Sequence, residues 1–120
     1  MNIKDLVKEL KSNNQVEAIY LFGSQATGKA RPYSDTDICV ILTEGSPQKV
    51  RKEILSYSSP KIEISIFSEL PLYIKYRIFK EGKPQFVKKK LNIHRLNVRT
   101  INNYLDFKNL LERHVNGVLI

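Results

Sequence analysis

The sequence predicts an α/β (α+β) domain in which helices flank a small mixed β-sheet. Segments with the apolar spacing of helices alternate along the chain with short runs rich in β-branched residues. The chain has 120 residues, 42% of them apolar, which suits one domain with a modest core. We therefore expect a single domain over residues 1–120.

The first half of the chain predicts a helix, two strands and a second helix. The stretch 2–13 carries apolar residues at helical spacing, and Asn2 is a suitable N-cap. The runs "VEAIYLF" (16–22) and "DICVIL" (37–42) have the composition of buried strands. The stretch 46–58 predicts a helix that begins beside a proline.

The second half predicts a strand, a helix, a short strand and a long tail helix. "KIEISIF" (61–67) alternates between isoleucines and polar residues, as a strand with one buried face does. The stretch 69–82 predicts a helix ending at its glycine, and a short strand is expected near "PQFVKK". The tail 99–115 is an amphipathic helix that either packs on the sheet or offers part of an interface. Its apolar stripe comprises Ile101, Tyr104, Leu105, Leu111 and Val115.

The stretch "GSQATGKA", residues 23–30, follows the first strand and has two interpretations. It matches the spacing of a P-loop, which cradles nucleotide phosphates, up to Lys29. A P-loop needs a hydroxyl next, to bind Mg²⁺, but Ala30 has none. It also needs a helix to begin there, and Pro32 disfavours one. The P-loop match is therefore a coincidence.

The second interpretation combines Gly23 and Ser24 with the acids Asp35 and Asp37. Ten residues separate Ser24 from Asp35. Residues two apart in a strand project from the same face, so these carboxylates are expected side by side. Two such close carboxylates repel each other, and bound Mg²⁺ removes that repulsion because hard cations prefer oxygen ligands. Gly23 would let the backbone approach a phosphate, and Ser24 would add a hydroxyl donor.

A third carboxylate is expected from the strand 61–67, where Glu63 lies on the face opposite the isoleucines. If that strand pairs beside 37–42, Glu63 reaches the same metal ions. Three carboxylates around two Mg²⁺ ions make a centre for phosphoryl or nucleotidyl transfer.

The motif "GSQATGKARPYSDTDI" resembles that of the minimal nucleotidyltransferases of the DNA polymerase β superfamily, antitoxins of MNT/HEPN toxin–antitoxin pairs. The stretches "ELPLYIKYRIFKEGK" and "YLDFKNLLERHV" also resemble later segments of that family. The resemblance implies a polymerase β-like nucleotidyltransferase fold. It further implies that the chain transfers AMP from ATP, in some relatives onto a tyrosine of the HEPN toxin, whose RNase activity is thereby silenced.

Residue by residue, the resemblance implies two groups of site residues. Catalysis and metal binding fall to Asp35, Asp37 and Glu63, with two Mg²⁺ ions and Glu63 as a further candidate for general base. Nucleotide binding falls to Gly23, Ser24, Lys29 and Ser34, of which Lys29 would neutralise triphosphate charge. The family more often has Asp where Glu63 stands, and Glu reaches one methylene further. This difference leaves a non-catalytic antitoxin as an alternative.

The charge distribution bears on the partner. The formal net charge is +8, of which residues 61–120 contribute +7, from twelve Lys and Arg against five Asp and Glu. Such a surface suits an acidic protein, a polyphosphate or RNA. The resemblance implies a HEPN-type toxin as the favoured partner, and RNA is possible but not favoured. The sequence does not decide whether the chain forms a homodimer or a hetero-oligomer. Nucleotidyl transfer to a small molecule or an RNA end is the second enzymatic alternative.

The remaining expectations concern location and the lone cysteine. No apolar run approaches the ~18 residues of a membrane span, and the N-terminus lacks the pattern of a signal peptide. We expect a cytoplasmic protein with no membrane contact. Cys39, the only cysteine, stands in an apolar run and is expected to be a small core residue.

Overall fold

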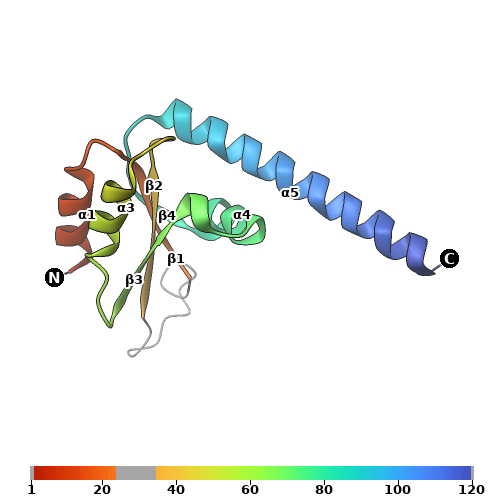
Figure 1. Cartoon of the computed structure of the whole chain (residues 1–120), viewed down its shortest axis with the longest axis horizontal. Coiled ribbons are helices and arrows are strands. Elements are labelled where there is room, and N and C mark those ends of the chain that lie inside the picture. Colours follow the sequence, from red (N-terminus) through yellow and green to blue (C-terminus); the bar gives the residue numbers. More distant parts are fainter. Residues whose placement is uncertain (1, 24–34, 120) are drawn as a thin grey trace.

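The computed structural model describes residues 2–23 and 35–119, with only the backbone at residues 118 and 119 (Figure 1). Its centre is a four-stranded mixed sheet in the order β3-β2-β1-β4. Strand β1 (Val16–Phe22) pairs antiparallel with both β2 (Thr36–Leu42) and β4 (Lys83–Val87). Strand β3 (Ile62–Ile66) runs parallel to β2. The predicted small mixed sheet flanked by helices is confirmed.

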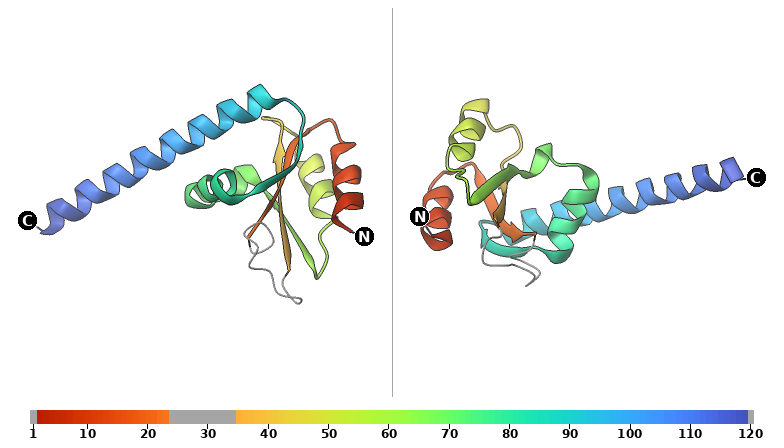
Figure 2. Two further views of the ribbon diagram at one scale, coloured as in Figure 1. Left: turned by 180° about the vertical axis from the view of Figure 1, so that it is seen from behind. Right: turned by 90° about the horizontal axis from the view of Figure 1, so that it is seen from below.

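Helices cover both faces of the sheet (Figures 1 and 2). On one face lie α1 (Ile3–Lys11) and α3 (Gln48–Leu55), and on the other α4 (Leu72–Glu81) and the first part of α5 (Lys90–Leu119). The 3₁₀ turn η1 (Phe67–Glu69) follows β3. No helix in the described part of the chain combines the length and hydropathy needed to cross a bilayer.

The two-residue period of the strands sorts the core into two clusters. Ile38 and Val40 of β2 face α1 and α3, whereas Cys39 and Ile41 face α4 and α5. Cys39 is fully buried, so the expectation that it is a core residue is confirmed. By the same alternation, Asp37 projects from the face that carries α4.

Several predicted boundaries hold closely. Helix α1 begins after Asn2, whose side-chain Oδ1 accepts a hydrogen bond of 2.9 Å from the backbone N–H of Asp5. Strand β1 has the predicted bounds. Helix α3 is shorter than the predicted 46–58, because Pro47 before it is extended and a turn at 56–57 follows it. Helix α4 begins at Leu72 rather than at residue 69, since η1 and Pro71 precede it.

Gly82 ends α4 as predicted, although its φ of −71° is not left-handed. A Cβ atom there would run into the carbonyl oxygen of Ile78, so this close approach explains the glycine.

The tail helix differs most from its prediction. Helix α5 begins at Lys90, well before the expected residue 99, and extends past residue 115. The chain spans 55 × 36 × 24 Å with a radius of gyration of 16.1 Å. A compact domain of this length has roughly 13–14 Å, and α5, projecting beyond the body, accounts for the excess (Figure 2).

Candidate active site

The glycine of the "GS" motif lies directly against the second acid of the Asp-x-Asp motif. Phe22, the last residue of β1, is the register partner of Asp37 in β2. The next residue, Gly23, has a φ of +72°, and a Cβ atom added there would lie 2.5 Å from Asp37 Oδ2. Any other residue would be strained in its backbone and would crowd the carboxylate. The glycine therefore permits a close approach that its position in the sequence does not reveal.

Glu63 stands beside Asp37 on the neighbouring strand. In the parallel pairing of β2 and β3, Asp37 and Glu63 are register partners. Both project from the face opposite the core isoleucines Ile38 and Ile64. The expected pairing of the strand 61–67 beside β2 is thus confirmed, and the two carboxyl groups come close enough to share a hydrogen bond.

This proximity changes the acidity of Asp37. Partial burial raises its pKa above the ordinary 3.8, and the negative charges of Glu63 and Asp35 raise it further. A hydrogen bond with Glu63 adds to the effect, because it stabilises the protonated carboxyl group. Like charges collect here without a cation among the described residues to balance them.

The donor set suits a hard divalent cation such as Mg²⁺, which would remove this repulsion. Within residues 2–23 and 35–119, however, no three side chains of His, Cys, Asp or Glu converge into a metal centre. Asp37 and Glu63 form a facing pair, and the exposed Asp35 just before β2 contributes charge. The protein therefore supplies an incomplete oxygen shell, which the phosphates of a nucleotide could extend.

The strands that carry the pair are firmly held. The backbone N–H of Thr36 donates to the carbonyl oxygen of Lys61 at 2.8 Å, which ties the start of β2 to the start of β3. Beside them, Phe79 of α4 makes edge-to-face contacts with Tyr20 of β1 and Phe67 of η1, at 5.6 and 5.3 Å between ring centroids. These contacts fix α4 on the face from which the carboxylates project.

Three of the predicted nucleotide-binding residues, Ser24, Lys29 and Ser34, lie outside the described residues. Gly23, Asp35, Asp37 and Glu63 are described, and the structure brings them to one end of the sheet.

Sequence reasoning missed a hollow of about 630 Å³ at the other end of the sheet. Thr43 and Glu44, which follow β2, line it together with the cations Lys75, Arg95 and Arg99. Asp37 and Glu63 are not among its lining residues. Part of the basic excess of residues 75–99 is therefore directed away from the candidate active site. The cation-rich stretch was visible in the sequence, but its position relative to the carboxylates was not.

Comparisons with known proteins show what the chain is similar to. A candidate protein adenylyltransferase of Methanocaldococcus jannaschii is 41% identical over 73 residues, which are 61% of this chain and 57% of that protein. The chain thus matches little more than half of that relative's length.

Solved structures show the same fold. A chain of a mutant MntA toxin–antitoxin complex aligns with a TM-score of 0.76 at 19% identity, over 100% of both chains. A toxin–antitoxin structure with AMP-PNP gives 0.74 at 17% identity, over 99% of this chain and 100% of that one. A complex of tri-AMPylated Shewanella oneidensis HEPN toxin with MNT antitoxin gives 0.64 at 17% identity, over 98% of this chain and 93% of that one.

The family comparison covers both the glycine and the carboxylates of the site. The family model described as polymerase beta, nucleotidyltransferase, matches residues 4–91 of the 120. With most of the chain matched and Gly23, Asp37 and Glu63 gathered at one end of the sheet, the chain belongs to the polymerase beta nucleotidyltransferase family of enzymes.

Proposed function

We propose that this protein is a Mg²⁺-dependent adenylyltransferase that transfers AMP from ATP to a tyrosine hydroxyl of a HEPN-type toxin and so acts as its antitoxin. The observation that carries the proposal is the register of Asp37 and Glu63, facing each other beside Gly23. A solvent-facing strand has no structural need for two adjacent carboxylates that repel each other.

The reaction would join the acceptor oxygen to the α-phosphorus of ATP and break the bond from that phosphorus to the bridging oxygen, releasing pyrophosphate. Gly23 leaves room for phosphate oxygens to approach the backbone and the Asp37 carboxylate. Asp35, Asp37 and Glu63 would hold the cation, and Glu63 would also be a candidate to accept the proton of the acceptor hydroxyl. Bound Mg²⁺ would supply charge neutralisation at the phosphates.

Two comparisons support the choice of nucleotide and acceptor. The named activity of the M. jannaschii relative is adenylyl transfer to protein. Structures with the same fold come from toxin–antitoxin complexes, one of them with AMP-PNP and another with an AMPylated HEPN toxin. The structural matches extend over α5 as well as the family region, so the whole chain resembles the antitoxin subunit. At these identities the likeness establishes the fold and nothing more. The tyrosine of a HEPN-type toxin is therefore proposed as the acceptor.

The proposal is tested with ATP labelled at the α-phosphate, Mg²⁺ and the co-purified HEPN-type protein as acceptor. We expect label on the acceptor, none when the label is at the γ-phosphate, and none with the Asp35→Asn/Asp37→Asn variant. Mass spectrometry then locates the AMP. RNA and the chain itself serve as alternative acceptors. Label on RNA alone would replace the proposed acceptor, and a tight complex without any transfer would make the protein a non-catalytic antitoxin.

A further inference from the structure

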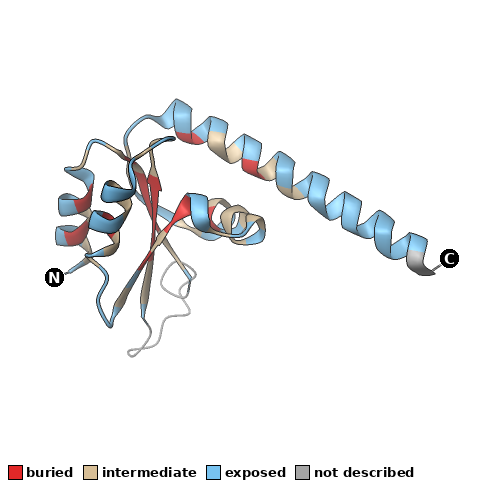
Figure 3. Cartoon of the chain, in the orientation of Figure 1, coloured by how far each residue is buried: buried red, intermediate tan, exposed pale blue. Residues whose placement is uncertain are grey.

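The distal half of α5 carries an apolar face that nothing in the described structure covers. We define the distal face as Phe107, Leu111 and Val115, with Leu110 at its edge. These four side chains are 47–63% exposed. Figure 3 shows the contrast along α5, with buried and half-buried positions near its start and exposed positions beyond them.

The distal face continues the face by which α5 packs on its own body. Ile93, Thr100 and Phe107 are spaced by seven residues and therefore lie in one row along the helix. Ile93 and Thr100 are 7% and 4% exposed, but Phe107 is 53% exposed. A parallel row joins Tyr104 to Leu111. Tyr104 stacks on Tyr76 of α4 at 4.0 Å between ring centroids, whereas Leu111 is 50% exposed.

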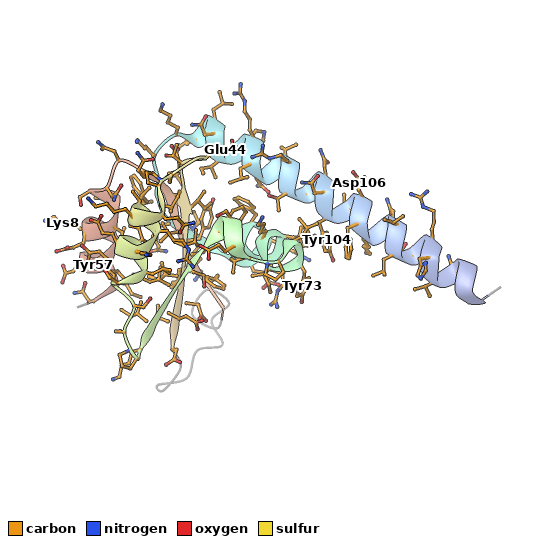
Figure 4. All side chains as sticks on the ribbon, viewed as in Figure 1. Lys8, Glu44, Tyr57, Tyr73, Tyr104 and Asp106 are labelled. Carbon is orange, nitrogen blue, oxygen red and sulfur yellow. The ribbon has the colours of Figure 1, made fainter. Side chains whose placement is uncertain are left out.

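The body ends where the packed part of this face ends. The stack of Tyr76 on Tyr104 joins α4 to α5, and Figure 4 shows Tyr104 directed from α5 toward α4. Beyond Tyr104 the helix extends away from the sheet and from α4 (Figures 1 and 2). A seam with the heptad spacing of a coiled coil thus starts inside the protein and runs out into solvent. We propose that the distal face pairs with the distal face of a second copy of this chain, in a symmetrical antiparallel dimer.

The charge of this segment permits a second copy and disfavours nucleic acid or a strongly acidic protein. The segment 105–117 holds two acids, Asp106 and Glu112, and two bases, Lys108 and Arg113, so its formal charge is zero in a chain of charge +8. It has no positive excess with which to attract nucleic acid or an acidic protein. Two copies can therefore meet at this segment without net repulsion. An antiparallel crossing also keeps the two basic bodies at opposite ends of the pair, where screening weakens their repulsion.

The available area fits a weak dimer. Large apolar side chains present roughly 150–200 Å² each when fully exposed, so four half-exposed ones offer on the order of 350 Å² per copy. Two copies would bury about 700 Å², which lies among weak, transient contacts below ~1,200 Å². Because the interface is isologous, one substitution alters both halves of it. The proposal does not rest on the proposed function, since it concerns the chain alone.

The test is sedimentation of the purified full chain across a micromolar concentration series. We expect reversible dimerisation by the wild type and at least tenfold weaker dimerisation by Leu111→Lys. Asn109→Lys is the matched control. It adds the same charge two residues away, about 200° around the helix, and should leave dimerisation unchanged. Far-UV circular dichroism checks that each variant stays helical, and Val115→Lys provides a second substitution on the distal face.

Three outcomes would overturn the dimer. One is a wild type that stays monomeric throughout the series, and another is a dimer that withstands both Leu111→Lys and Val115→Lys. The third is a chain that is monomeric alone but whose distal face becomes protected from hydrogen exchange when the HEPN-type acceptor is added. That result would assign the face to the acceptor instead. Failure of adenylyl transfer would leave all of these readouts unaffected.

Discussion

Asp37 and Glu63 are register partners across the parallel pairing of β2 and β3, on the face of the sheet that carries α4. Two acids in this arrangement raise the pKa of Asp37 and weaken the folded protein unless a cation joins them. Stability therefore does not explain their position, whereas the proposed binding of a cation would.

Substitution of Glu63 tests its contribution to transfer. Glu63→Gln keeps the side-chain shape but removes the charge and the basicity, so we expect a loss of about 100-fold or more in the rate of label transfer. Glu63→Asp keeps a carboxylate on a side chain one methylene shorter and should retain activity within about tenfold. Rates measured over a series of Mg²⁺ concentrations check both variants. Equal activity of Glu63→Gln and wild type would remove Glu63 from the mechanism.

Removal of the Asp37 charge should stabilise the protein in the absence of divalent cations. The native pKa of Asp37 is raised above the 3.8 of the unfolded chain, so between these values the native state binds more protons. Stability therefore falls as the pH rises through this window and stays lower above it. The Asp37→Asn side chain cannot ionise, so this variant does not lose that stability. We expect its melting temperature at pH 7 to be a few degrees above that of the wild type, because 1 kcal/mol corresponds to about 4–8 °C in a small domain.

Thermal melts between pH 3 and pH 7, with and without Mg²⁺, check this prediction. The difference between Asp37→Asn and wild type should close as the pH falls below 3.8, and Mg²⁺ should reduce it at pH 7. Asp106→Asn, which removes an exposed charge on α5, should show neither effect. A lower melting temperature for Asp37→Asn at every pH would contradict the argument.

The strands and the facing acids were predictable because strand patterns have a period of two. Alternation in "KIEISIF" placed Glu63 opposite the isoleucines, and the two-residue spacing of the Asp-x-Asp motif placed Asp37 on the same face of its own strand. Once β2 and β3 pair, the proximity of the two acids follows. The cap at Asn2 was likewise a local effect, carried by one side chain and the backbone three residues on.

Contacts between distant segments were not predictable in the same way. Nothing local to Gly23 shows that its missing Cβ leaves room for the carboxylate of Asp37, fourteen residues later. Helix α5 was predicted only from residue 99, whereas it begins at Lys90, where Ile93 packs against the body. The sequence showed the apolar stripe of the tail but could not show that Tyr104 is packed while Leu111 is exposed.

Cys39 should be inert in the folded protein. It is fully buried, and burial raises the pKa of its thiol to about 12. At pH 8, about one thiol in ten thousand would then be ionised, even before access is considered. We expect alkylation by iodoacetamide to be slower by on the order of 1,000-fold in the native state than in denaturant. Because Cys39 is the only cysteine, mass spectrometry of the intact chain follows the reaction, and rapid native labelling would contradict its burial.

Gly23→Ala and Gly45→Ala form a matched pair that isolates the contact between Gly23 and Asp37. Both glycines have a positive φ, +72° and +79°, so each substitution costs about 1–2 kcal/mol of backbone strain. A Cβ atom at Gly45 meets nothing within 4 Å, whereas at Gly23 it meets Asp37 Oδ2. We therefore expect a loss of stability in denaturant titrations that is at least as large for Gly23→Ala as for Gly45→Ala, and a loss of ATP binding and label transfer in Gly23→Ala alone. If Gly45→Ala lost transfer to the same extent, the effect would come from strain, and the close approach at Gly23 would have no part in nucleotide binding.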